Sequence, residues 1–367
     1  MYRLLTSYNR MSSSIVHLFH NREAMSKHVA PRGFPERAAR LNGVHTVLER
    51  TGTFHECVSH LVSDPADRSV FVRAYGEDTV RAWEEAVGRA EDLDRPIADV
   101  RFSDTVWSAG SLAAVGVAAA AAIRAVETVL AAPDVQHAFA LVRPPGHHCF
   151  QVPAGFCIAN NVALAAQVAL DAGKRVAIID WDYHFGDGTA ETFVSNQNVF
   201  FTSLHCAMNR YGGETYPSHP LKADALATAT GGRMFNILWD KDDADDAAYS
   251  AAFRQVICPA LTRFRPDLIL ISAGYDALQG DSLAGMRLSP RIFLELALTL
   301  KQLDKPIVCV LEGGYSPELL GRGVEATIVG LLRPLSEAPL FLERRVAPHH
   351  AAVIQKTARL IGLPDMP

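Results

Sequence analysis

Aspartate and histidine residues occur at one point of the sequence with a spacing suited to binding a metal ion. Asp182 and His184 stand two residues apart, where the apolar run 176–181 ends. In extended backbone, side chains at positions i and i+2 point to the same side, so a carboxylate and an imidazole can bind one ion. Asp276 follows another apolar run, 268–272, and is the candidate third ligand. Two carboxylates and one imidazole suit Zn²⁺ or a neighbouring first-row ion and leave a position open for water.

These residues also have a purely structural interpretation. Asp182 can cap a helix, and His184 can be a packed core histidine. The metal site is favoured because three such residues follow buried strands, and the carboxyl ends of parallel strands form the edge of a sheet where ligands bind.

Two adjacent histidines, His147 and His148, follow the stiff turn 144–146. Asp180 and Asp187 flank the metal-binding stretch, and a buried carboxylate can orient an imidazole and tune its pKa. Attack of water on an amide needs a base for the water proton and an acid for the leaving amine. Two histidines held by two aspartates can divide that work, although adjacent histidines on a loop are often only exposed polar residues.

Glycines precede an aromatic residue at two further places. In Gly313-Gly314-Tyr315 the glycines allow close approach of the backbone to a ligand, and the phenol can donate to a developing oxyanion. The alternative is a turn with a packed aromatic ring. Gly155 and Phe156 are either core residues at the start of a helix or the wall of a narrow apolar channel.

The elements that position these residues follow from alternating apolar and helical patterns. Six runs are short, apolar on both faces and typical of buried strands: Phe139–Val142, Val176–Trp181, Val199–Leu204, Met234–Leu238, Leu268–Ser272 and Ile307–Leu311. Helical patterns lie between them at Asn160–Asp171, Ala247–Arg263 and Arg291–Leu303. The alternation predicts an α/β fold, with a mostly parallel sheet and helices on both faces.

The remaining segments complete a single-domain prediction. We expect the region before Phe139 to be helical, with 104–110 as a loop that leads into an alanine-rich helix. We expect a core over 14–335 and a helical tail over 336–367 that ends in a surface helix, Ala351–Leu360. The apolar stretch 112–123 is shorter than the about 20 residues of a membrane span and indicates a buried helix.

Composition excludes several classes of protein. The chain has 367 residues, 49% hydrophobic and 20% charged, which is typical of a globular protein. Its net charge is −5 with no long basic run, so we expect no direct binding to nucleic acid. Because no apolar stretch is long enough, we also expect no membrane span. Six cysteines without a Cys-x-x-Cys pair argue against a disulfide framework and a thiolate zinc site, and favour a reducing compartment: the cytoplasm, or the nucleus in a eukaryote.

Five motifs in this order resemble the zinc-dependent histone deacetylase family: Arg143-Pro-Pro-Gly-His-His, Gly155-Phe-Cys-x-x-Asn-Asn, Asp180-Trp-Asp-Tyr-His-x-Gly-Asp-Gly-Thr, Ser272-Ala-Gly-Tyr-Asp and Leu311-Glu-Gly-Gly-Tyr. That family includes bacterial histone deacetylase-like amidohydrolases and acetylpolyamine amidohydrolases. The resemblance runs from Pro35 to Pro334, and Asn160-Asn161 and Glu312 are closer to class II members. It implies an arginase/deacetylase fold with an eight-stranded, mostly parallel central sheet.

The resemblance also implies roles for individual residues. One Zn²⁺ per chain would be bound by Asp182, His184 and Asp276. The implied catalytic residues are His148 as general base and acid, His147 as an electrostatic partner, Tyr315 as oxyanion donor, and Asp180 and Asp187 as the partners of the histidines. The implied substrate-binding residues are Gly155, Phe156, Tyr216, Asp104 and Gly314. A structural K⁺ would lie near Asp180, Asp182, His184, Ser203 and Leu204, held mainly by backbone carbonyls.

The match to the family is incomplete at several positions. Arg37 falls where an arginine can lie behind the active site. Phe185 replaces a second histidine found in many relatives, and Phe34 replaces the histidine usual in class II members. The stretch 206–232, which should form part of the pocket rim, matches poorly.

The sequence therefore predicts a zinc-dependent amidohydrolase that removes acetyl or acyl groups from the Nε amine of lysine in proteins such as histones. Alternatives are a deacetylase of acetylpolyamines or other small amides, and a catalytically silent acetyl-lysine-binding scaffold; the presence of Tyr315 disfavours the scaffold. An arginase-like centre with two manganese ions is disfavoured because Asp276 is followed by Ala277-Leu-Gln-Gly and lacks the second acid of an Asp-x-Asp pair. The expected partners are an acetylated lysine peptide or protein, or an acetylated polyamine, and self-association into a homo-oligomer is compatible with the sequence.

Overall fold

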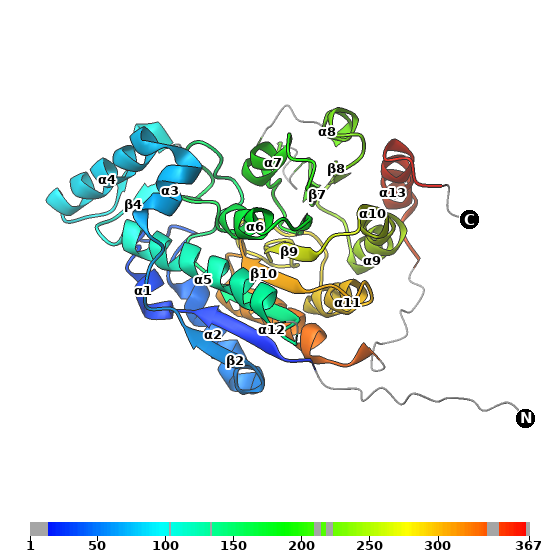
Figure 1. Ribbon diagram of the computed structural model, residues 1–367, viewed down its shortest axis with the longest axis horizontal. Helices are drawn as coiled ribbons and strands as arrows, with labels where there is room; N and C mark the ends of the chain where they lie inside the picture. The colour runs from blue at the N-terminus through cyan, green and yellow to red at the C-terminus, as the bar shows by residue number, and fades with distance from the viewer. Residues whose placement is uncertain are drawn as a thin grey trace, which may run out of the picture.

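A single eight-stranded sheet forms the centre of the computed structural model, which describes residues 14–102, 104–132, 134–208, 214–217, 223–335 and 345–364. The strand order is β2-β1-β5-β10-β9-β6-β7-β8, and every neighbouring pair is parallel (Figure 1). The strands are β1 (Val16–His20), β2 (Val58–Leu61), β5 (His137–Leu141), β6 (Val176–Asp180), β7 (Val199–Cys206), β8 (Met234–Trp239), β9 (Leu268–Ala273) and β10 (Ile307–Leu311). The predicted α/β fold with an eight-stranded central sheet is confirmed.

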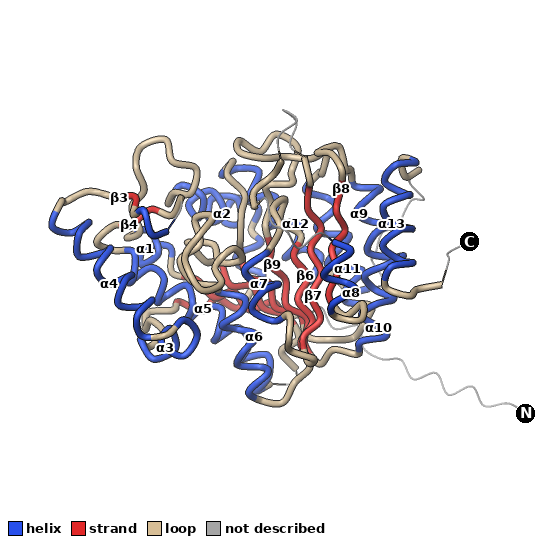
Figure 2. Tube along the Cα trace, turned by 90° about the horizontal axis from the view of Figure 1, so that it is seen from above, coloured by secondary structure: helices blue, strands red, loops and turns tan. Residues whose placement is uncertain are grey.

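Helices cover both faces of this sheet (Figures 1 and 2). Connections that move toward β8 place α5 to α8 on one face, and connections that move toward β2 place α2 and α9 to α11 on the other, as right-handed crossovers require. α12 follows β10, the last strand, and packs against α2 and α11 on that second face. The helices are α1 (Arg22–Ser26), α2 (Ala39–Thr51), α3 (Arg68–Tyr75), α4 (Glu77–Asp92), α5 (Ser111–Ala131), α6 (Asn161–Asp171), α7 (Asp187–Phe193), α8 (Ala223–Ala229), α9 (Asp246–Ala252), α10 (Cys258–Phe264), α11 (Pro290–Lys301), α12 (Pro317–Leu332) and α13 (Pro348–Leu360).

All six predicted strands are present within one or two residues of their expected ends. Their side chains are buried on both faces, because helices cover both sides of the sheet. The predicted helix Ala247–Arg263 is interrupted: α9 and α10 are joined by a π-helical turn, η3 (Phe253–Ile257). The alanine-rich helix is α5, and within the described residues it is the one helix long and apolar enough to cross a membrane. It lies against α6 and β5, and 67% of its apolar window is buried in the protein interior.

The prediction that the region before Phe139 is helical is wrong in part, because β1 and β2 lie there. β1 has the sequence Val-His-Leu-Phe-His, in which histidines interrupt the apolar run, and β2 is a short, mostly exposed edge strand. Neither carries the strong signal of a buried strand. The expected loop 104–110 contains a short strand, β4 (Val106–Trp107), which pairs with β3 (Ile97–Ala98).

The C-terminal helix is more closely packed than a surface helix. α13 begins three residues before its predicted start, and it contacts β8 and α9 through a buried face that includes His350, Ile354 and Ala358. Residues 336–344 and 365–367 of the predicted tail lie outside the described part of the chain.

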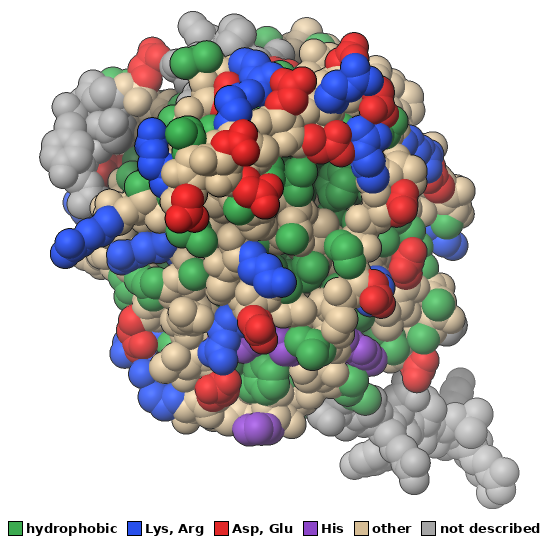
Figure 3. Space-filling view, turned by 90° about the vertical axis from the view of Figure 1, so that its left-hand side faces the viewer, with side chains coloured by type: hydrophobic (Ala, Val, Ile, Leu, Met, Phe, Trp, Pro, Cys, Tyr) green, Lys and Arg blue, Asp and Glu red, His purple; other side chains and the backbone are tan. Residues whose placement is uncertain are grey.

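Charged side chains of both signs are interspersed on the face of the molecule at the left of Figure 1 (Figure 3). On α3 and α4 the exposed Arg68 forms ion pairs with Glu77 and Glu84. Pairs of this kind neutralise each other locally, so α3 and α4 do not present a surface of one sign.

The topology brings the chemically active loops together. β5, β10, β9 and β6 are adjacent in the sheet, and the tandem histidines, Tyr315, Asp276 and Asp182 each follow one of these strands. Because the strands are parallel, all four loops leave the same edge of the sheet.

Candidate metal centre and catalytic pocket

The three candidate metal ligands converge in the structure. His184 Nδ1 lies 3.2 Å from Asp182 Oδ1 and 3.0 Å from Asp276 Oδ2. Both aspartates are fully buried, whereas the His184 side chain retains 14% of its exposure. Two buried carboxylates around one imidazole need compensating positive charge, so this donor set is suited to a divalent cation.

The backbone around this centre fits a metal site. The Gly313 N–H donates to Asp182 Oδ2 at 2.9 Å, and the Tyr183 N–H donates to Asp276 Oδ1 at 2.9 Å, which fixes the two carboxylates. A Cβ on Gly274 would lie 1.9 Å from Asp182 Oδ2, so no larger residue fits there. The cradle therefore holds both acids with one oxygen directed at His184.

Electrostatics in this cluster also indicate a cation. Burial and the adjacent Asp182 carboxylate raise the pKa of Asp276 to about 6. Burial alone would raise the pKa of Asp182 too, but the positive potential of His147 and His184 lowers it below its usual range. Such strong mutual perturbation is typical of functional sites.

Each tandem histidine is held by its own aspartate. His147 Nδ1 lies 2.9 Å from Asp180 Oδ2, and His148 Nδ1 lies 2.7 Å from Asp187 Oδ1. Burial and the neighbouring His147 lower the pKa of His148 to about 4, although Asp187 opposes the shift. Burial also disfavours charge on His147, but Asp182 and Asp180 outweigh it and raise its pKa well above 6.5. The pKa values of the two adjacent imidazoles are thus shifted in opposite directions, an arrangement typical of acid–base pairs.

Tyr315, His148 and His184 face the same cavity. The volume of this cavity is about 330 Å³. The loop that carries Tyr315 is fixed from two sides. The Tyr315 N–H donates to Asp281 Oδ2 at 2.7 Å, and Arg40 Nε donates to the Gly314 carbonyl at 2.7 Å. The Arg40 guanidinium also lies 5.1 Å from the centre of the Tyr315 ring.

Arg40, rather than Arg37, is the arginine behind the active site. Arg37 is exposed, whereas Arg40 is buried in the first turn of α2 and bonds to Glu36 at 3.1 Å. Motif position favoured Arg37. Arg40 is identified instead by its burial beside the buried acid Glu36, which lies four residues earlier, just before α2 begins. Glu36 also accepts from Arg143 Nε at 2.8 Å, which connects α2 to the loop after β5.

Four of the five expected substrate-binding residues line the cavity, namely Asp104, Gly155, Phe156 and Tyr216. The Gly155 N–H donates to Asp104 Oδ1 at 2.8 Å. The rings of Phe156 and Tyr315 meet edge to face at 5.8 Å, and those of Tyr216 and His148 at 5.0 Å. Gly314 does not line the cavity; its carbonyl faces Arg40 instead.

Four further residues line the cavity without having been predicted from the sequence: Tyr183, Glu214, Thr215 and Leu283. Of these four residues, Tyr183 is the one that the sequence could have indicated, because it lies between the predicted ligands Asp182 and His184. Glu214 and Thr215 belong to a segment with weak motif similarity, and Leu283 follows no recognisable pattern.

The residues expected near potassium are also neighbours. Asp180 and Ser203 are paired in register between β6 and β7, and Leu204 follows Ser203. Phe185 is buried and stacks on the His205 ring at 4.7 Å, so this side chain takes part in an aromatic contact.

Comparison with known proteins agrees with this geometry. Residues 34–331 match the histone deacetylase domain family. Histone deacetylase 15 of Arabidopsis thaliana is 38% identical over 218 residues, which are 58% of this chain and 39% of that protein. Polyamine deacetylase HDAC10 of Danio rerio is 32% identical over 304 residues, which are 80% of this chain and 43% of that protein.

A solved structure described as the HDA15 HD domain superposes with a TM-score of 0.80 at 29% identity, covering 95% of both chains. The chain therefore belongs to the histone deacetylase family and has its α/β fold. It spans less than half the length of the two curated relatives described above.

Proposed function

We propose that this chain is a zinc-dependent deacetylase that removes acetyl groups from the Nε amine of lysine in proteins such as histones. One observation carries the proposal: His148, Tyr315 and the metal-ligand His184 line one cavity, and Asp182 and Asp276 complete the ligand set at its base. A base, an oxyanion donor and a Lewis-acid site around one cavity are the groups that amide hydrolysis needs.

Asp182, His184 and Asp276 are the residues that would hold one Zn²⁺. When bound, such an ion polarises the amide carbonyl and lowers the pKa of the attacking water. We also propose a structural K⁺ near Asp180 and Ser203, in the position that the family resemblance implies.

His148 is the general base in this proposal. Its Nδ1 is committed to Asp187, so Nε2 is the nitrogen that accepts the proton of the attacking water. The low pKa of His148 keeps it neutral before the reaction. The same nitrogen then delivers the proton to the leaving amine, while His147, held by Asp180, supplies positive charge.

Tyr315 is the proposed oxyanion donor. Burial, reinforced by Asp276, raises the pKa of its phenol well above 10. The hydroxyl therefore stays protonated and can donate a hydrogen bond to the substrate oxygen. Arg40 binds the Gly314 carbonyl, and Asp281 accepts from the N–H groups of Tyr315 and Ser316, so the backbone is held on both sides of Tyr315 before substrate arrives.

Acetylated polyamines are the second candidate substrates. Two carboxylates, Asp104 and Glu214, lie among the residues that line the cavity. A polyamine carries further ammonium groups beyond the acetylated end, and these would be attracted to such acids. A polyamine deacetylase is also among the relatives of the chain.

The test is turnover of acetyl-lysine peptides and acetylated polyamines by the purified protein, before chelation, after chelation and after zinc is restored. We expect deacetylation that is lost with the metal and recovered with zinc, and faster turnover of peptides. Metal-independent activity would contradict the mechanism, faster turnover of polyamines would favour the second substrate class, and peptide binding without turnover would indicate a silent scaffold.

Six unpaired cysteines, buried or partly buried, are consistent with a reducing compartment, and we propose the cytoplasm or nucleus.

A further inference from the structure

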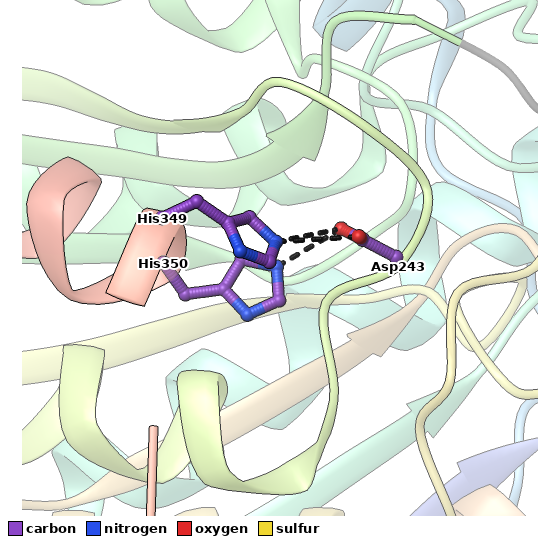
Figure 4. Close-up of side chains that lie close together, drawn as sticks. All are labelled: Asp243, His349 and His350. Carbon is purple, nitrogen blue, oxygen red and sulfur yellow. Dashed lines mark hydrogen bonds and ion pairs between the residues drawn. The ribbon is translucent and has the colours of Figure 1, made fainter. Parts of the chain in front are cut away.

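A second group of metal-ligand type lies beside β8, the last strand at one side of the sheet, where the loop after β8 meets the first turn of α13. It consists of Asp243, in the loop between β8 and α9, and the adjacent His349 and His350 (Figure 4). Both imidazoles direct Nε2 at the Asp243 carboxylate: His349 lies 3.2 Å from Oδ2, and His350 lies 3.0 Å from Oδ1. Among the described residues, this is the other group, besides Asp182, His184 and Asp276, whose ligand atoms all lie within 4.8 Å of one another.

We propose that Asp243, His349 and His350 form a second divalent-cation site, of the zinc class, that is distinct from the catalytic centre. Two neutral imidazoles and one carboxylate are donors that zinc takes in proteins. This donor set belongs to the C-terminal helix and the loop after β8, so nothing in the proposed deacetylation accounts for it.

The spacing of the donors supports an ion. Zinc binds imidazole nitrogen and carboxylate oxygen at about 2.0–2.2 Å, which places neighbouring ligands of a tetrahedron about 3.3–3.6 Å apart. Taken to the single oxygen Oδ1 of Asp243, the separations of His349 Nε2 and His350 Nε2 are 3.3 Å and 3.0 Å. Small outward movements of the rings would therefore suffice to admit the ion.

Charge and exposure around the group are also suitable. The segment 240–246 contains a single lysine and five aspartates: Asp240, Asp242, Asp243, Asp245 and Asp246. The His350 side chain is 4% exposed, whereas those of Asp243 and His349 are 28% and 52% exposed. One side of the site is thus anchored in the protein and the other is open, so water can complete the coordination shell.

One feature limits the expected affinity. His350 Nδ1 is buried and has no hydrogen-bond partner among the described residues. A metal-bound histidine usually donates its other N–H to an acceptor, and loss of that partner typically weakens binding about 10–100-fold. We therefore expect micromolar affinity for zinc, weaker than that of a fully supported structural site.

An ion here would join two segments distant in sequence. α13 packs on β8, and the His350 ring meets Trp239, the last residue of β8, at 5.4 Å. The loop that carries Asp243 continues to Ala244, whose carbonyl accepts from the Arg287 N–H at 2.9 Å. The site would fasten the C-terminal helix to this loop.

The test is zinc counting on the tag-free full chain, after chelation and equilibration with free zinc in large excess over the expected micromolar dissociation constant. We expect two zinc ions per chain for the wild type and one for His349→Ala and for Asp243→Asn. The matched control is His55→Ala, which removes an exposed histidine elsewhere and should keep both ions. His349 is half exposed, so its variant is expected to fold, and its circular dichroism spectrum checks this.

A second readout does not depend on stoichiometry. Zinc should raise the melting temperature of the wild type further than that of His349→Ala when the catalytic site of both is already filled. Equal zinc content and equal melting shifts in the two proteins would overturn the proposal and leave Asp243 as a hydrogen-bond acceptor for two imidazole N–H groups. Because deacetylation is not measured, this result is independent of the proposed function.

Discussion

The carboxylate of Glu312 accepts a hydrogen bond from the Gly146 N–H at 2.6 Å, and the same oxygen accepts from the His147 N–H at 3.2 Å. Glu312 directly follows β10, three residues before Tyr315, whereas Gly146 belongs to the turn after β5. One buried side chain thus fixes the distance between the loop of the oxyanion donor and the tandem histidines. The other oxygen of Glu312 is buried and has no hydrogen-bond partner in the part of the chain that the structure describes, and burial raises the pKa of the acid to about 8.

Replacement of Glu312 should therefore affect both stability and catalysis. Glu312→Ala leaves two buried N–H groups unpaired, at a cost of about 1–3 kcal/mol each in unfolding free energy. Glu312→Gln keeps a carbonyl acceptor and should lose much less stability. Urea unfolding and kcat/KM of both variants provide the measurement. Equal losses for the two variants would show that the hydrogen bonds to Gly146 and His147 are not what Glu312 contributes.

Gly155 tests the placement of His148. A Cβ at this position would lie 2.3 Å from His148 Cδ2 and 2.9 Å from Tyr216 Cε1, so Gly155→Ala must displace the ring of the proposed base. Misplacement of a catalytic group by about 1 Å can cost about 10²-fold in rate, and we expect a loss of that order in kcat/KM.

Gly173→Ala is the matched control for this substitution. Gly155 and Gly173 have φ values of +57° and +72°, so alanine strains the backbone at both, but nothing lies within 4 Å of a Cβ at Gly173. Both variants should lose about 1–2 kcal/mol of stability from that strain, and the control should keep its activity. A similar loss of activity in the two proteins would assign the effect to backbone strain rather than to His148.

The predictability of these features from sequence depends on how local their signals are. The β6 strand and the candidate ligands Asp182 and His184 are contiguous, so the apolar pattern and the i, i+2 spacing were sufficient to place these two side chains together. β1 was missed because its histidines break the apolar pattern, although Val16 and Leu18 are fully buried. Burial of its partly polar face depends on packing against distant helices, which no local pattern reveals.

Long-range contacts explain the rest of what was missed. Arg40 reaches the Gly314 carbonyl across 274 residues of sequence, and this contact exists only once α2 packs beside the loop after β10. Leu283 enters the cavity from a loop without a motif. The family resemblance supplied the order of the motifs, but it pointed to Arg37 because it could not show which arginine of 37–40 faces inward.

Tyr315→Phe should lower kcat by about 10²–10³, the usual effect of removing one oxyanion-hole donor, with little change in KM. The control is Tyr216→Phe, because Tyr216 lines the same cavity and the change also removes a single hydroxyl. Tyr216 has no assigned role in proton or oxyanion chemistry, so its variant should retain kcat. Steady-state kinetics with an acetyl-lysine peptide make the comparison. A change in kcat of less than about twofold for Tyr315→Phe would remove it as an oxyanion donor.

His45 gives a prediction for stability at acid pH that is remote from the catalytic centre. It lies on α2 with 4% exposure, between the rings of His20 at 5.1 Å and Phe54 at 5.7 Å, and its Nε2 has no partner among the described residues. Burial, followed by the positive potential of His20 and Arg22, lowers its pKa from 6.5 to about 4. The unfolded chain therefore binds a proton at His45 at a higher pH than the folded chain does.

The sign of the effect follows from that difference. Keeping His45 neutral contributes up to about 3 kcal/mol to the unfolding free energy. This contribution is complete above pH 6.5, the pKa of the unfolded chain, and is lost as the pH falls toward 4. In His45→Leu this loss is absent, so the unfolding free energy of the wild type should decrease more steeply between pH 7 and pH 4.5 than that of the variant. His55→Leu, which replaces an exposed histidine, should follow the wild type. Urea unfolding at four or five pH values measures the slopes, and parallel curves for the wild type and His45→Leu would show that His45 titrates alike in the folded and unfolded chains.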